Sequence, residues 1–91
     1  MTDVTSPLRQ DPSSHRLDAR GLHCPLPILR TRKTLNGMAP GETLRVEATD
    51  PASVIDFKHF CNTTDNVLLE CRIEDGVYYY LIRRGGNDDE S

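Results

Sequence analysis

The chain has 91 residues, of which 36% are apolar, and it carries a formal net charge of −3 with an isoelectric point near 5.5. This length accommodates one small domain, and the acidic charge argues against general nucleic-acid binding, which needs a basic surface. Three cysteines, an odd number, suit a reducing compartment better than a disulfide framework.

The two ends of the chain differ in composition from its centre. Residues 1–14 hold few aliphatic side chains, and residues 87–91 are acidic, so we expect two disordered tails around one domain at residues 15–86. No segment is long and apolar enough to form a transmembrane helix, and the N-terminus lacks the apolar core of a signal peptide. We therefore expect no membrane contact and a cytoplasmic location.

The first third of the domain predicts a strand followed by a helix. Residues 16–20 alternate weakly between apolar and charged side chains, which favours a strand, and Gly21 interrupts them. Residues 25–36 predict a helix whose first turn holds Pro25 and Pro27, where a missing N–H group costs little. An apolar stripe on this helix is formed by Ile28, Leu29, Leu35 and Met38.

The rest of the domain predicts a second helix and three strands. Residues 43–49 alternate cleanly, as expected of a strand with one buried face. Asp50-Pro51 is typical of a helix cap and first helical residue, and this helix is expected to reach about Cys61. Residues 66–73 and 77–83 predict two strands joined by an Asp-Gly hairpin turn. One face of the third strand carries Val67, Leu69, Cys71 and Ile73.

The order of these elements is βαβαββ. Strands joined through helices should be parallel neighbours or near neighbours, and the last pair should be antiparallel. A mixed four-stranded sheet with both helices packed on one face would bury the apolar stripes. We therefore predict an α/β two-layer sandwich.

Cys24 lies at the predicted start of the first helix and is followed at once by Pro-x-Pro. The positive end of a helix dipole favours the thiolate, which is the reactive form of sulfur. Because Pro25 and Pro27 lack N–H groups, only Leu26 among the first helical residues can donate an amide hydrogen bond, so we expect a modest lowering of the pKa. A stiff, exposed thiol of moderate reactivity suits a group carrier. The alternative is a cysteine that caps the helix and packs as a small hydrophobe.

Several residues close to Cys24 in sequence can be interpreted as structural or as functional. Asp18 is interpreted as a structural residue that orients Arg20 or accepts amide hydrogen bonds in the following turn, and Gly21 as relief of backbone strain. A basic run on the first helix is either a solvated face or a docking surface for an acidic partner. That run consists of Arg30, Arg32 and Lys33.

The remaining cysteines and tyrosines favour packing roles. Cys61 and Cys71 lie on apolar faces and are expected to be buried, although Cys61 could act as a resolving thiol if it lay near Cys24. The His and Cys spacing matches no compact zinc site, so we expect no metal. Cross-strand packing is the simplest interpretation of Tyr78-Tyr79-Tyr80, and an aromatic platform for RNA is the alternative.

The pattern Asp18-x-x-Gly21-Leu22-x-Cys24-Pro25-x-Pro27 resembles the signature of the TusA/SirA family of small sulfur-carrier proteins, and most closely its TusA members. The resemblance extends from about His15 to Gly86. It includes Arg32-Lys33-Thr34-Leu35, Met38-x-Pro40-Gly41-Glu42, Thr49-Asp50-Pro51-Ala52, Phe60-Cys61 and the closing Tyr80-Leu81-Ile82-Arg83-Arg84-Gly85-Gly86.

This resemblance implies that Cys24 carries sulfur as a persulfide, supported by the motif residues Asp18, Gly21, Pro25 and Pro27. The implied donor is a pyridoxal-phosphate cysteine desulfurase, and the implied acceptor is a downstream sulfur-relay protein serving 2-thiolation of the wobble uridine in tRNA. Molybdenum-cofactor sulfuration and sulfur oxidation are other pathways associated with the family. The resemblance implies a sulfurtransferase-type carrier with no cofactor, no independent turnover and no direct nucleic-acid contact.

Two other hypotheses stay open at this point. One is an RNA-binding or regulatory module without cysteine chemistry, which the fold alone suggests and the acidic charge disfavours. The other is a redox module that pairs Cys24 with Cys61.

Overall fold

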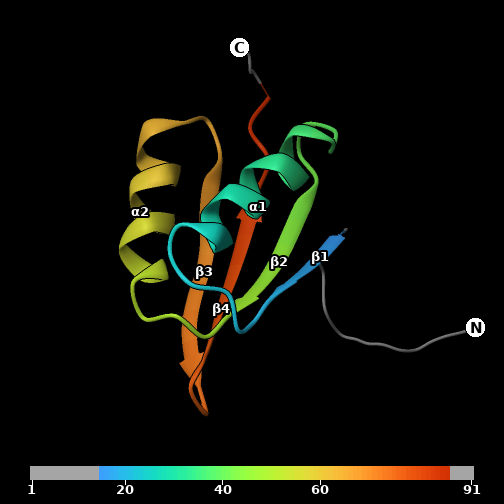
Figure 1. The fold of residues 1–91 in the computed structure, drawn as a ribbon. Coiled ribbons are helices and arrows are strands. Elements are labelled where there is room, and N and C mark those ends of the chain that lie inside the picture. The colour runs from blue at the N-terminus through green and yellow to red at the C-terminus, as the bar shows by residue number, and fades with distance from the viewer. Residues whose placement is uncertain (1–14, 87–91) are drawn as a thin grey trace, which may run out of the picture.

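The computed structural model describes residues 15–86, so both predicted tails, residues 1–14 and 87–91, lie outside the described residues. The elements follow the predicted order βαβαββ (Figure 1). They are β1 (His15–Ala19), α1 (Leu26–Asn36), β2 (Thr43–Ala48), α2 (Ser53–Thr63), β3 (Val67–Glu74) and β4 (Val77–Arg83). Within residues 15–86, neither helix has the length and apolar character needed to cross a bilayer.

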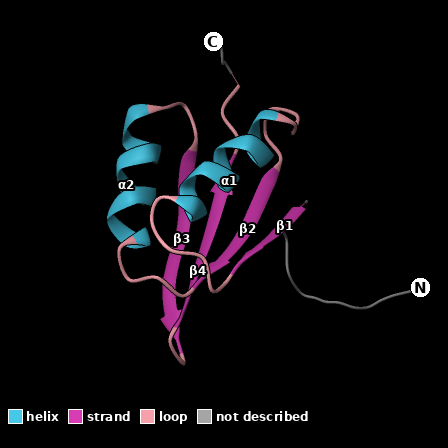
Figure 2. Ribbon diagram, in the orientation of Figure 1, coloured by secondary structure: helices cyan, strands magenta, loops and turns pink. Residues whose placement is uncertain are grey.

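The four strands form one mixed sheet in the order β1-β2-β4-β3. β1 pairs in parallel with β2, from His15 opposite Leu44 to Ala19 opposite Ala48, and β4 runs antiparallel to both of its neighbours. β2 and β3, which α2 connects, are therefore parallel with β4 between them. Both helices cover one face of the sheet and leave the other face open (Figure 2). This arrangement is the predicted α/β two-layer sandwich.

The core lies between the helices and the covered face of the sheet. Its aromatic centre is a stack of Phe57 from α2 on Tyr80 from β4, with ring centroids 4.2 Å apart and an interplanar angle of 10°. The Tyr80 hydroxyl is hydrogen-bonded to the Ser53 hydroxyl at 2.6 Å, so its polar end is satisfied although the residue is fully buried. The other buried apolar residues around this stack are Ala19, Leu35, Met38, Leu44, Val46, Ala48 and Ile82.

The buried face of α1 differs in part from the predicted stripe. The helix begins at Leu26, one residue later than predicted, and its buried positions are Pro27, Thr31 and Leu35. Thr31 was not predicted to be buried, but its hydroxyl donates to the Pro27 carbonyl at 2.8 Å and so needs no other partner. Leu29 was assigned to the stripe, yet it is 50% exposed because it lies outside the four-residue spacing of the buried positions.

β3 contradicts the expectation of a buried apolar face. Leu68 pairs with Ile82 and Glu70 pairs with Leu81, so an extra residue, Leu69, forms a bulge. Beyond the bulge Ile73 is 61% exposed, since β3 is an edge strand that the short α2 covers only in part. The alternation of apolar residues in this segment correctly predicts a strand. It predicts neither the bulge nor the position of β3 at the edge of the sheet.

Substitution of Phe57 by alanine should destabilise the domain severely. Deleting a fully buried phenylalanine costs about 3–5 kcal/mol, a large part of the roughly 5–15 kcal/mol that holds such a domain folded. Urea unfolding followed by far-UV circular dichroism measures the loss. Ile55→Ala on the same helix is the control, because Ile55 is 74% exposed and its loss should cost less than about 0.5 kcal/mol. Equal losses in the two variants would contradict this description of the core.

Candidate functional site

Two loops meet at the carboxyl ends of β1 and β2. Because these strands are parallel and end at Ala19 and Ala48, the segments that follow them start side by side. The Gly21 amide donates to the Thr49 hydroxyl at 2.9 Å, which ties the first loop to the second. Gly21 has a φ of +82°, in the left-handed region, so a side chain here would strain the turn that leads to Cys24. The predicted role of Gly21 in relieving strain agrees with this geometry.

Asp50 joins the loop that carries Cys24 to the start of α2. One of its carboxylate oxygens accepts the Cys24 amide at 2.6 Å, and the other accepts the Ala52 amide at 3.0 Å. These two amides, that of Cys24 first, hold the pKa of Asp50 below its ordinary value. The prediction that Asp50 caps this helix is wrong, because α2 begins at Ser53 with Ala52 as its N-cap and without a side-chain cap hydrogen bond. Asp50 instead ties the turn before α2 to the backbone of the cysteine.

The Cys24 side chain is exposed and its thiol donates to a carboxylate oxygen of Asp56 at 2.9 Å. Asp56 lies in the first turn of α2. This hydrogen bond raises the pKa of Cys24 above its ordinary value, and partial desolvation and the charges of Asp56 and Asp50 act in the same direction. The sequence-based expectation of a lowered pKa was therefore wrong, because the thiol is hydrogen-bonded to the Asp56 carboxylate and the charge of Asp50 adds to the effect.

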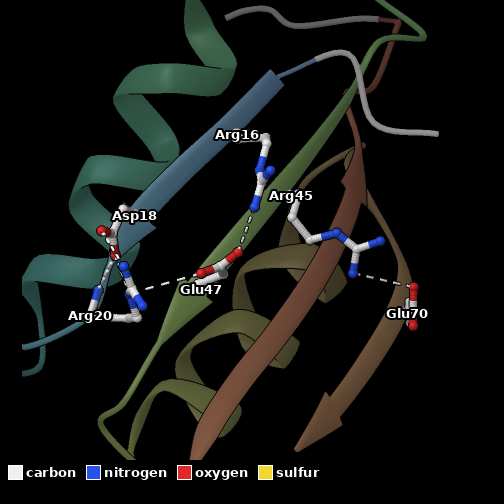
Figure 3. A network of polar contacts seen from close by, with 6 residues as sticks. All are labelled: Arg16, Asp18, Arg20, Arg45, Glu47 and Glu70. Carbon is white, nitrogen blue, oxygen red and sulfur yellow. Dashed lines mark hydrogen bonds and ion pairs between the residues drawn. The ribbon is translucent and has the colours of Figure 1, made fainter. Parts of the chain in front are cut away.

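Asp18 orients Arg20 through a two-pronged contact on the open face of the sheet (Figure 3). Its oxygens accept from Arg20 Nε at 2.9 Å and from the second guanidinium nitrogen at 3.0 Å, and the Arg20 amide adds a third hydrogen bond at 3.1 Å. These hydrogen bonds lower the pKa of Asp18 to about 2. Arg20 also lies 3.8 Å from Glu47, so its charge is shared between two carboxylates. Asp18 thus has the structural role predicted for it.

The prolines and the basic run follow Cys24 along the chain. The Cys24–Pro25 peptide bond is cis, Pro25 is the N-cap of α1, and Pro27 is a buried residue of its first turn. The three basic residues, Arg30, Arg32 and Lys33, are all exposed on α1. They thus lie on the surface of the helix that begins two residues after the thiol.

Neither of the other two thiols, those of Cys61 and Cys71, forms a disulfide with Cys24. All three cysteines are free. Cys61 is half-buried, as predicted in part, and burial raises the pKa of its thiol to about 11. Cys71 was predicted to be buried, but it is exposed on the edge strand β3. Among residues 15–86 no group of three or more histidine, cysteine, aspartate or glutamate side chains is arranged to hold a metal ion.

The three consecutive tyrosines are divided between the two faces of the sheet. Tyr80 is stacked in the core and Tyr78 packs against it. Tyr79 lies on the open face, where the Arg72 guanidinium sits 4.4 Å from its ring centroid. The predicted cross-strand packing is confirmed, and the tyrosines do not form one aromatic platform.

The family model described as Sulfurtransferase TusA matches residues 15–84. A protein from Allochromatium vinosum named sulfur carrier protein TusA is 54% identical over 68 residues, which covers 75% of this chain and 90% of that protein. The chain belongs to the TusA family. A crystal structure of a SirA-like protein from Desulfitobacterium hafniense has the same fold, with a TM-score of 0.68 and 27% identity over 78% of this chain and 97% of that one. The family resemblance read from the sequence is confirmed.

Two carboxylates of this TusA-family site were not predicted as functional residues. Asp50 was interpreted only as a cap, and Asp56 was not singled out. The sheet topology could have pointed to them. Parallel strands place the loops that follow them at the same end of the sheet, so the segment after β2 lies next to the segment after β1. Side-chain contacts within that meeting point depend on loop conformation, which periodicity does not determine.

We predict that alkylation of Cys24 by iodoacetamide has a pH midpoint above that of free cysteine, since Asp56 holds the thiol proton. Cys61 should react more slowly, because it is half-buried and the pKa of its thiol is about 11. Peptide mapping by mass spectrometry over a range of pH gives both rates. A midpoint for Cys24 below that of free cysteine would contradict the carboxylate contact.

Proposed function

We propose that this TusA-family protein accepts sulfane sulfur from a cysteine desulfurase as a persulfide on Cys24 and passes it to a downstream sulfur-relay protein. The pathway we propose is 2-thiolation of the wobble uridine in tRNA. The observation that carries this proposal is an exposed thiol whose backbone amide is fixed by Asp50 and whose sulfur is held by Asp56. Membership of a sulfur-carrier family supports it.

The proposed transfer is an exchange between a thiol and a persulfide. Cys24 Sγ gives up its proton and attacks the outer sulfur of the donor persulfide. A new S–S bond forms on Cys24, and the old S–S bond breaks as the donor cysteine leaves as a thiolate. No external oxidant is consumed, because one S–S bond replaces another. The same exchange with an acceptor thiol unloads the carrier. Each step needs a sulfur that a partner's active site can reach, and Cys24 is exposed.

This function needs no cofactor on the carrier itself, since pyridoxal phosphate belongs to the donor enzyme. It also needs Cys24 in its reduced form between cycles, which fits the reducing conditions of the cytoplasm. Asp18, Gly21, Pro25 and Pro27 would support the site by fixing the loop. Asp18 holds the guanidinium of Arg20, and the Gly21 amide is hydrogen-bonded to Thr49. Pro25 and Pro27 form the start of α1.

We further propose that the exposed basic residues of α1 form the docking surface for a donor with an acidic face. Charged surfaces on either side of an encounter steer association and raise its rate. Because α1 begins directly after Cys24, a partner attracted to Arg30, Arg32 and Lys33 would arrive next to the thiol.

The two alternative functions gain no support from the geometry. A Cys24–Cys61 redox pair requires close α-carbons, yet Asp56 already occupies the place beside the thiol. Cys61 lies five residues further along α2, about 7.5 Å along the helix axis. An RNA-binding module is disfavoured because the tyrosines are split between the core and the open face.

Replacement of Cys24 by serine should abolish sulfur loading and leave the fold intact, since the side chain is exposed. The measurement is intact mass after incubation with a cysteine desulfurase, pyridoxal phosphate and cysteine. Wild-type protein should gain one sulfur atom that a reductant removes, and Cys24→Ser should gain none. Cys71→Ser, which removes another exposed thiol, is the matched control and should load normally. Loading of Cys24→Ser would refute the proposal.

Charge reversal on α1 should slow loading at low donor concentration. We expect the double variant Arg30→Glu, Lys33→Glu to load roughly tenfold more slowly below saturation and at normal rate at saturation, because only the encounter is weakened. Added salt should narrow the difference. The double variant Lys58→Glu, Arg83→Glu reverses two exposed charges on α2 and β4, makes the same change in net charge, and is the control. An equal effect of this control would show that net charge, and not the α1 surface, controls docking.

A further inference from the structure

The Cys24 thiol donates a hydrogen bond to Asp56, a contact that sulfur carriage by Cys24 does not by itself require. A carrier thiol reacts as the thiolate, yet here a carboxylate holds the thiol proton at 2.9 Å and a second carboxylate, Asp50, lies beside the same cysteine. Charge alone would make such a site a poor one for sulfur transfer, because two negative groups oppose a third. This cost calls for a function of Asp56 other than electrostatic stabilisation.

We propose that Asp56 is a catalytic residue that takes the proton from Cys24 Sγ as this sulfur attacks the donor persulfide, and returns it when the loaded sulfur leaves. This inference rests on the proposed carrier function of Cys24 and deepens it. The contact already has the geometry of a thiol and its general base, with a heavy-atom separation inside hydrogen-bond reach.

The loading step then balances without an external base. The Cys24 Sγ–H bond breaks as its proton moves to the Asp56 oxygen, and Sγ forms its bond to the outer sulfur of the donor persulfide. The donor S–S bond breaks and its electron pair stays on the departing cysteine, which leaves as a thiolate. Asp56 is neutral once it holds the proton, so the carboxylate no longer repels the electron-rich sulfurs beside it.

The unloading step is the reverse. An acceptor thiolate attacks the outer sulfur, and the bond from that sulfur to Cys24 Sγ breaks. A thiol with a raised pKa is a slow leaving group, so protonation of Sγ as it departs would speed this step. By microscopic reversibility the carboxyl group that took the proton during loading returns it during unloading, and the thiol–carboxylate hydrogen bond is restored.

The position of Asp56 on a helix suits this role. It lies in the first turn of α2, whose buried positions Ser53 and Phe57 flank it in sequence and are anchored to Tyr80 in the core. The cysteine reaches it from the loop that Asp50 fixes. The fold thus holds both the thiol and the carboxylate in place. Their hydrogen-bond geometry is maintained between encounters with partner proteins.

The test compares two reactions of the Asp56→Asn variant near neutral pH. Alkylation by iodoacetamide reports the thiolate fraction, which should rise when the carboxylate is removed, so this rate should increase. Persulfide loading from a saturating cysteine desulfurase, followed by intact mass in a single turnover, should fall on the order of 100-fold because the base is lost. The two rates should therefore move in opposite directions, which a purely structural or electrostatic role would not produce.

Two further variants make the result specific. Asp65→Asn makes the same chemical change beyond the other end of α2 and should leave both rates unchanged, whereas Asp56→Glu retains a carboxylate and should recover part of the loading rate. The other titratable groups around the pair, Asp50, His23 and Tyr80, are present in every variant. Circular dichroism and thermal melting verify that each variant is folded.

The outcomes separate this inference from the proposed function. If Asp56→Asn loads at the wild-type rate or faster while Cys24→Ser does not load, Cys24 is the carrier and the role assigned to Asp56 is wrong. If Cys24→Ser still gains sulfur, the carrier function itself fails and the inference falls with it. Loss of loading in Asp56→Asn together with slower alkylation would indicate a disturbed site, and would also overturn the proposal.

Discussion

The parallel pairing of β1 with β2 is the constraint on which the site depends. Within residues 15–86 it is the one parallel pairing, so the two segments that follow β1 and β2 leave the same end of the sheet although they are far apart in sequence. The residues after β1 supply the thiol, and those after β2 supply the two carboxylates that hold its amide and its sulfur. β4 fixes this pair from the side by pairing along the whole of β2, and its Tyr80 anchors α2 through Ser53 and Phe57. The core therefore positions the reactive group through α2 as well as through the strands.

The electrostatic character of the site is decided by distance. A helix N-terminus stabilises a nearby negative charge by about 0.3–1 kcal/mol, and only over the first turn. α1 starts beyond Cys24, and the prolines at 25 and 27 remove two of the amides through which such a terminus acts. A carboxylate in direct hydrogen-bond contact with the sulfur is closer and carries a full charge, so it determines the direction of the pKa shift. The raised pKa favours the protonated form of Cys24 between transfers. A neutral thiol at an exposed position is oxidised or alkylated less readily than a thiolate.

How far the sequence could predict this molecule varies with the kind of interaction. Element order and sheet type follow from periodicity and from the turn residues, and the family from the Cys-Pro-x-Pro pattern with its surroundings; all three are confirmed. The exposed side of β3 could not be predicted, because a single extra residue at Leu69 changes the register and an edge position is a property of the whole sheet. Thr31 was missed since a buried hydroxyl breaks the apolar pattern, although a local hydrogen bond satisfies it. Asp56 has no local sequence signal at all: its meaning comes from a residue that precedes it by 32 positions.

The open face of the sheet carries charged side chains that pair with one another. Several of its charges form opposite-sign pairs, among them Arg16 with Glu47 at 2.9 Å and Arg45 with Glu70 at 3.5 Å (Figure 3). Arg72 likewise pairs with Glu70 and Glu74. The pairs that Arg72 makes with Glu70 and Glu74 are exposed and add little to stability. All of these pairs cancel the local field over short distances. A face that neutralises itself offers little attraction to phosphate groups or to a strongly charged partner. Under the docking proposal, the exposed basic residues of α1 would supply the long-range attraction and would draw an acidic partner toward the end of the domain where the reactive sulfur lies.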